Sequence, residues 1–118
     1  MKKKAKTTNR WRWVLADETM FLDAGDKRRK RFAKYKEKHG FSPDELWNLD
    51  ITIASFVLPR LVEFRKYCTD DIAESVDAMV TAFSLLLDDE YPWFDKEKQQ
   101  AIDHGLDEFR NSFQSLWT

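Results

Sequence analysis

Cationic and aromatic side chains alternate near the start of this sequence, in a pattern that suits contact with nucleic acid. Arrayed cations pair with backbone phosphates, and unpaired bases stack on exposed aromatic rings. A first group mixes lysine and arginine with two tryptophans, and a second group is a dense basic run. The residues predicted to bind nucleic acid or another partner are Lys2, Lys3, Lys4, Lys6, Arg10, Trp11, Arg12, Trp13, Lys27, Arg28, Arg29, Lys30, Arg31 and Lys34.

The same cations are compatible with contacts of a different kind, and the sequence does not choose among them. The basic stretch can lie on an acidic part of its own chain or of a second copy, with Trp11 and Trp13 simply buried. It can also meet a membrane surface, although the apolar side of such a helix would be small.

Carboxylates spaced three apart suggest an enzymatic alternative. Glu74 and Asp77 have the Glu-x-x-Asp spacing with which all-α nucleotide pyrophosphohydrolases bind magnesium, and Glu45, Asp50 or Glu63 could face them from the preceding helix. A site of this kind needs about four acids around its cations. A full Glu-x-x-Glu partner segment is missing, and the spacing is common on charged helix faces.

Histidine and cysteine are too few for a metal centre. His39 lies at an expected helix end, and His104 stands four residues before Glu108. Metal sites need three or four convergent ligands, so neither histidine predicts one. The single Cys68 has no dedicated histidine and is most simply a small packed side chain. We therefore predict no catalytic residue, no metal ligand and no cofactor.

The formal net charge of −1 hides an uneven distribution along the 118 residues. Residues 1–40 contain 14 basic and 5 acidic residues, a net charge of +9. Residues 41–118 contain 6 basic and 16 acidic residues, a net charge of −10. We therefore expect a basic N-terminal arm and helix over residues 1–40 and an acidic helical body over residues 41–118, within a single domain.

Helices must position these residues, and the clearest boundary falls at residues 39–46. Gly40 can take the left-handed conformation that ends a very basic helix over residues 26–39. A capping box and a hydrophobic staple then mark the start of the next helix, with Ser42, Pro43 and Glu45 in the first and Phe41 and Leu46 in the second.

Apolar residues at spacings of three and four predict a central helix that packs on two sides. Pro59 lies inside it and predicts a kink or a break. Asp50 is a second N-cap candidate, which leaves open a short helix followed by a longer one. The stripe consists of Leu46, Leu49, Ile53, Val57, Leu61 and Phe64, widened by Trp47, Ile51, Ala54, Leu58 and Val62.

Two more helices follow. One opens at Thr69 with a stripe from Ile72 to Leu87, and the last runs from about Asp95 to Leu116, where Gly105 suggests close packing. Residues 8–24 fit a strand or a helix. The predicted fold class is all-α, a small helical bundle of three core helices plus a basic N-terminal helix or extension.

One segment resembles small uncharacterised helical proteins encoded by bacteriophages and prophages. It comprises Glu45 to Asp50, with its Trp-x-Leu-Asp element, then Thr52-Ile53-Ala54, Leu58-Pro59-Arg60-Leu61 and Phe64. The resemblance covers roughly residues 41–67 and implies a phage origin and action in the cytoplasm of a bacterial host. A cytoplasmic location also agrees with the lack of a long apolar run and with the charges at Arg10, Arg12, Asp17 and Glu18.

These observations favour a phage-encoded accessory protein of non-enzymatic type. It would bind a host or phage protein or nucleoprotein complex, and it would inhibit or modulate a nucleic-acid enzyme or a defence complex. Direct nucleic-acid binding by the basic N-terminus is the first alternative, and a magnesium-dependent nucleotide pyrophosphohydrolase is the second. A homo-oligomer is compatible with each hypothesis.

Overall fold

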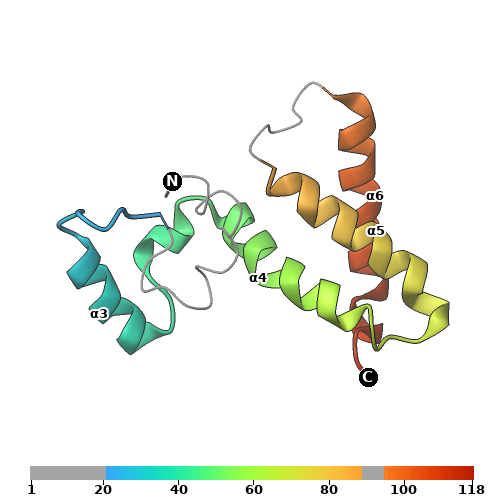
Figure 1. Ribbon diagram of the computed structural model, residues 1–118, viewed down its shortest axis with the longest axis horizontal. Helices are drawn as coiled ribbons and strands as arrows, with labels where there is room; N and C mark the ends of the chain where they lie inside the picture. The colour runs from blue at the N-terminus through green and yellow to red at the C-terminus, as the bar shows by residue number, and fades with distance from the viewer. Residues whose placement is uncertain (1–20, 89–94) are drawn as a thin grey trace. The chain divides into compact units, whose positions relative to one another are not determined.

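The computed structural model describes residues 21–88 and 95–118, and these residues form helices joined by turns without any strand. The all-α prediction is therefore confirmed for the described part of the chain. In order, the elements are α3 (Arg29–His39), the 3₁₀ helix η2 (Pro43–Leu46), α4 (Leu49–Phe64), α5 (Asp70–Leu86), α6 (Lys96–Ser112) and the 3₁₀ helix η3 (Phe113–Ser115), as labelled in Figure 1.

Contacts within the chain divide it into two compact units, Met1–Phe56 and Val57–Thr118, with the division inside α4. The N-terminal unit holds 14 basic and 8 acidic residues, and the C-terminal unit holds 6 basic and 13 acidic residues. The two units therefore carry net charges of +6 and −7. The predicted separation of a basic arm from an acidic body after residue 40 stays a prediction.

The predicted boundary after α3 is present. Gly40 ends this helix with a left-handed φ of 88°, and its N–H donates to the Lys36 carbonyl. Ser42 and Glu45 form the predicted capping box, with Pro43 in the first turn. The capped element is the 3₁₀ helix η2, and α4 begins only at Leu49. The short helix followed by a longer one, left open by the sequence, is the arrangement found. Asp50, the predicted N-cap of the longer helix, lies inside its first turn instead.

The capping box is part of a buried polar group, which we call the Ser42 cluster and which consists of Ser42, Asp44 and Glu45. Ser42 and Asp44 are 0% exposed and Glu45 is 7% exposed. The Ser42 hydroxyl lies 2.5 Å from Asp44 Oδ1 and 3.1 Å from Glu45 Oε2, and the Ser42 N–H donates to Glu45 Oε2 at 3.0 Å. Buried carboxylates are costly unless they accept such bonds.

The Ser42 cluster also joins three separate segments of the N-terminal unit. Asp44 Oδ2 accepts the Phe21 N–H at 2.6 Å, which attaches the chain that precedes α3. Glu45 Oε2 lies 3.5 Å from Lys36 Nζ on α3. The Thr52 hydroxyl donates to the Glu45 carbonyl oxygen at 2.7 Å, which attaches the first turn of α4.

The predicted apolar stripe of α4 is buried only in part. Ala54 and Leu61 of the stripe are 0% and 5% exposed, whereas Leu49 and Ile53 are 50% and 48% exposed. Leu46, at the end of η2, is 57% exposed. The polar residues Thr52 and Ser55 are buried, and the Thr52 hydroxyl donates to the Glu45 carbonyl. The Phe41 ring packs edge-on against Tyr35, and the predicted staple of Phe41 with Leu46 stays a prediction.

Pro59 does not break α4, which runs without interruption from Leu49 to Phe64. Proline has no N–H, so the carbonyl of Ser55 lacks its usual helical donor. The Ser55 hydroxyl is buried, and it has no hydrogen-bond partner within the described structure.

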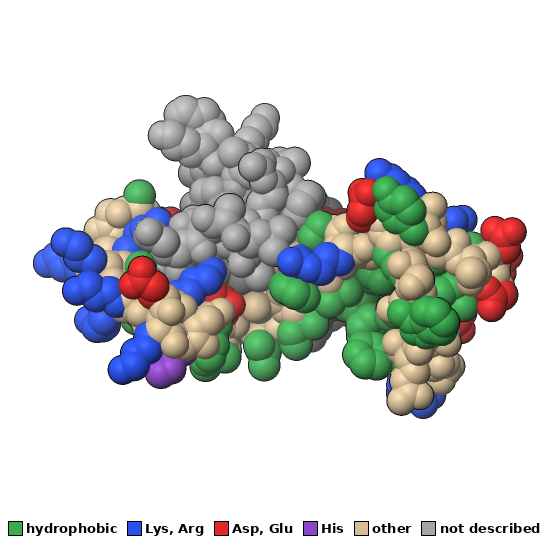
Figure 2. All heavy atoms as spheres, turned by 90° about the horizontal axis from the view of Figure 1, so that it is seen from below, with side chains coloured by type: hydrophobic (Ala, Val, Ile, Leu, Met, Phe, Trp, Pro, Cys, Tyr) green, Lys and Arg blue, Asp and Glu red, His purple; other side chains and the backbone are tan. Residues whose placement is uncertain are grey.

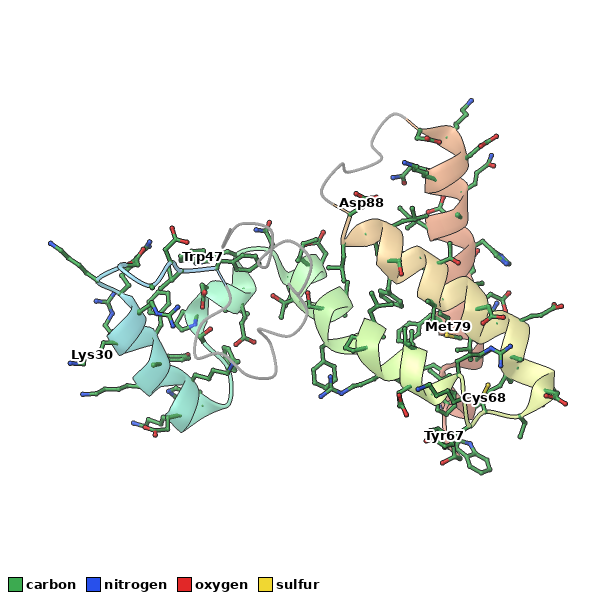
Figure 3. The ribbon with its side chains drawn as sticks, in the orientation of Figure 1. Lys30, Trp47, Tyr67, Cys68, Met79 and Asp88 are labelled. Atoms are coloured by element: carbon green, nitrogen blue, oxygen red, sulfur yellow. The ribbon has the colours of Figure 1, made fainter. Side chains whose placement is uncertain are left out.

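In the C-terminal unit, α5 and α6 pack extensively against each other. The predicted stripe of α5 supplies Val76, Met79 and Phe83, all almost fully buried, and Figure 3 labels Met79 in this region. Ile102 of α6 is 4% exposed. The predicted start of α6 is confirmed, because the Asp95 side chain caps the helix by accepting the Lys98 N–H at 3.1 Å.

Gly105 marks the closest approach of α5 and α6. A Cβ placed on this residue would overlap the Cβ of Ala82 and the carbonyl oxygen of Ala78. Glycine is therefore required here, because there is no space for a side chain. Glycine inside a helix costs about 1 kcal/mol against alanine, and the close packing that it permits offsets this cost.

Gly105→Ala is expected to lower the free energy of unfolding by about 1–3 kcal/mol, the usual cost of overpacking. Urea unfolding followed by far-UV circular dichroism measures this change. Gly25→Ala is the matched control, because a Cβ on Gly25 meets nothing within 4 Å. Equal stability of the two variants would contradict the close contact.

Ser42→Ala removes the hydroxyl that both buried carboxylates share and should cost about 1–3 kcal/mol. Hydrogen exchange of the Phe21 and Gly40 amides should accelerate, because the first donates to Asp44 and the second closes α3. The control is Ser84→Ala at an exposed position of α5. Unchanged protection of both amides in Ser42→Ala would refute the role of the cluster.

Candidate nucleic-acid interface

The outward face of α3 carries a row of exposed cations. Lys30, Arg31, Lys34 and Lys38 follow one another at helical spacing, and Lys27 precedes them by one turn. None of the five forms an ion pair with a carboxylate of the described residues. Figure 2 shows Lys and Arg side chains gathered over α3, and Figure 3 shows Lys30 pointing away from the helix. We call these five side chains the α3 cation face.

Other cations of the same run serve the fold of the N-terminal unit. Arg29 donates to the Leu22 carbonyl at 3.0 Å, and Lys36 pairs with Glu45 of the Ser42 cluster. Phe32, the one buried side chain of α3, lies on the same side. The helix thus divides its charges between an inner side that attaches it and an outer side that faces solvent.

Arg28 is held in place by two neighbours. It makes a two-pronged pair with Asp26, at 3.0 Å for Nε to Oδ1 and 2.9 Å for Nη2 to Oδ2. Its guanidinium also lies over the Trp47 ring, 5.2 Å from the centroid. The hydrogen bonds from Arg28 lower the pKa of Asp26 from 3.8 to about 2, and the same pair raises the pKa of Arg28.

Partly exposed aromatic rings lie on α3 and against it. Trp47 packs edge-on against Phe32 with centroids 6.1 Å apart, yet it is 49% exposed. Tyr35 lies 4.1 Å from His39 and 5.7 Å from Phe41 between ring centroids. Tyr35 is 39% exposed and Phe41 is 36% exposed, so both rings reach the surface.

Of the predicted binding residues, Lys27, Lys30, Arg31 and Lys34 lie together on the α3 cation face. Arg28 and Arg29 are predicted residues that are used in internal contacts instead. The remainder lie outside the described residues, namely Lys2, Lys3, Lys4, Lys6, Arg10, Trp11, Arg12 and Trp13.

Three residues of this surface are absent from the predicted set, namely Lys38, Tyr35 and Trp47. Helical spacing could have found two of them. Lys38 follows Lys34 by four residues, and Tyr35 follows Arg31 by four. The sequence predicts that Trp47 packs as part of the central helix, and no pattern in it indicates the exposure of this ring.

The acids of the enzymatic alternative do not form a cluster within residues 21–88 and 95–118. Asp77 pairs with Arg65, with Nε to Oδ1 at 2.8 Å, and this pair raises the pKa of Arg65. In the described part of the chain, no group of three or more histidine, cysteine or acidic side chains is placed to hold a metal ion. The magnesium-dependent hydrolase stays a prediction.

Glu108, the neighbour of His104 on α6, accepts a hydrogen bond from Ser75 at 2.6 Å. Cys68, in the turn between α4 and α5, donates to the Arg65 carbonyl at 3.6 Å between sulfur and oxygen. Figure 3 labels this cysteine beside Tyr67. Glu108 and Cys68 thus both make structural contacts within the C-terminal unit.

Among the described helices, none has the length and apolar character needed to cross a membrane. The sequence matches no protein-family model, and comparison with curated proteins and with solved structures gave no match either. The exposed cations of the α3 cation face, with Tyr35 beside them, are the candidate site that the described residues offer.

The Asp26 carboxyl should titrate with a midpoint near pH 2. Because this pKa is depressed, the pair stabilises the folded chain above about pH 4 and loses that effect as the pH falls through about 2. Carbon-13 NMR of the carboxyl measures the midpoint. Arg28→Ala should return it toward 3.8, whereas Lys34→Ala, which removes an exposed cation, should leave it unchanged. A midpoint insensitive to Arg28→Ala would contradict the pairing.

Proposed function

We propose that this chain is a non-enzymatic binding protein that contacts nucleic acid through the α3 cation face. The observation that carries the proposal is the exposure of five cations on one side of a helix whose other cations are used internally. Cations that make no ion pair with a described carboxylate remain available for phosphates. When these cations pair with the phosphates of a nucleic acid, they displace its counterions, and the affinity is therefore higher at low salt.

The length of the face suits a nucleic-acid backbone. Lys30 and Lys38 are eight residues apart on α3, which is about 12 Å along a helix. Phosphates along one strand of duplex DNA are about 3.4 Å apart in axial rise, so this length corresponds to about four phosphates. Lys27, in the turn that precedes α3, adds a fifth cation next to the start of the helix.

The wider role that we propose is that of a phage or prophage accessory protein in the cytoplasm of a bacterial host. The resemblance of residues 41–67 supports a phage origin. A basic surface that contacts nucleic acid and an acidic C-terminal unit that contacts a protein would together suit a nucleoprotein complex, such as a nucleic-acid enzyme or a defence complex. In this proposal α4, α5 and α6 form three core helices, α3 is the basic helix, and the cations and tryptophans of residues 1–13 extend the contact.

Lys30→Ala/Lys34→Ala should weaken binding to nucleic acid of every sequence, because lysines on a helix surface neutralise phosphates. The plot of log affinity against log salt should become shallower by roughly 1.5 to 2. Fluorescence anisotropy with labelled oligonucleotides between about 50 mM and about 200 mM salt measures both effects.

The matched control is Lys66→Ala/Lys96→Ala, which removes the same charge from exposed positions of the C-terminal unit. This variant should bind like the unaltered chain. An equal loss of affinity in both variants would mean that net charge alone explains the effect and would contradict a role of the α3 cation face. Failure of the unaltered chain to bind DNA or RNA at low salt would refute the proposal.

A further inference from the structure

The aromatic rings next to the α3 cation face are partly exposed, whereas aromatic side chains normally bury their surface in a core. Trp47 and Tyr35 are 49% and 39% exposed in the unit whose only buried aromatic side chain among the described residues is Phe32. Each ring has neighbours that contact it. Trp47 contacts Phe32 and Arg28, and Tyr35 contacts His39 and Phe41.

Tyr35 lies beside the cations on α3. It stands four residues after Arg31 and three before Lys38, so it neighbours both cations on the helix. Trp47 lies beside the residue that caps the start of α3, because the Arg28 guanidinium is 5.2 Å from the centroid of its ring.

The composition of the face argues against base reading in a duplex. Four of its five cations are lysines, which act as point charges toward phosphates, and Arg31 is the single arginine. Reading of base edges relies on two-pronged donors such as arginine, asparagine and glutamine. Arg28 and Arg29 could supply such forks, but both are used in internal contacts.

We infer that the nucleic acid bound here is single-stranded, with its phosphates on the α3 cation face and unpaired bases stacked on Trp47 and Tyr35. This inference rests on the proposed function. Bases inside a duplex already stack on one another, whereas a single strand offers its bases to exposed rings. Phosphates alone would account for the cations, and unpaired bases would in addition use the exposed rings of Trp47 and Tyr35.

The test compares a labelled oligo-dT strand of about 15 nucleotides with a duplex of the same length, by anisotropy at low salt. The single strand should bind more tightly. Trp47→Leu and Tyr35→Leu should each weaken single-strand binding between about 5-fold and about 100-fold, the range for one base stacked on one ring. Because a ring releases no counterions, the salt dependence should stay as in the unaltered chain.

Matched controls come from the C-terminal unit, where Trp117 and Tyr67 are 75% and 66% exposed. Trp117→Leu and Tyr67→Leu should bind like the unaltered chain. Circular dichroism checks folding, and if Trp47→Leu loses helix through its contact with Phe32, the Tyr35→Leu variant alone decides the test.

Two results would overturn the inference and leave the proposed function standing. One is equal affinity for the duplex and the single strand. The other is an unchanged affinity in a folded Tyr35→Leu variant while Lys30→Ala/Lys34→Ala still weakens binding. Lack of binding to either nucleic acid by the unaltered chain would instead defeat the proposed function itself.

Discussion

The arrangement of the N-terminal unit depends on two carboxylates that are buried side by side. Asp44 and Glu45 are 0% and 7% exposed, and they share the Ser42 hydroxyl as a donor. Burying charge is tolerated only when donors converge on it, so the carboxylates require the segments that bring those donors. The chain before α3 brings the Phe21 N–H, and α3 brings Lys36. Among residues 21–56 few large side chains are buried, and polar contacts join the segments of this part of the unit.

This constraint also determines which cations face solvent. Since Lys36 and Arg29 are directed inward to Glu45 and to the Leu22 carbonyl, the other side of α3 must carry Lys30, Lys34 and Lys38 outward. Tyr35, one turn from Arg31 and from Lys38, is partly exposed beside them. The α3 cation face is therefore a consequence of the way in which α3 is attached. The inward contacts of Arg29 and Lys36 determine which cations face solvent.

Local signals in the sequence predicted much of the fold. Gly40, Ser42 and Asp95 end or begin helices where expected, because a left-handed glycine or a side-chain acceptor acts within four residues. The predicted buried stripe of α4 is present only in part, since Ala54 and Leu61 are buried while Leu49 and Ile53 are about half exposed. Periodicity does not encode the bond from the buried Thr52 hydroxyl to the Glu45 carbonyl. Four predicted site residues share one surface, whereas Arg28 and Arg29 are engaged elsewhere, because a run of like charges does not reveal which members have partners.

The contact at Gly105 bears on how the sequence can change over time. A side chain at position 105 meets the Cβ of Ala82 and the backbone at Ala78, so drift at positions 82 and 105 is limited to the smallest residues. The exposed lysines of α3 can exchange with arginine, or shift along the helix, at little cost in stability. Distant relatives of this chain would therefore share small residues at positions 82 and 105 more faithfully than any surface residue.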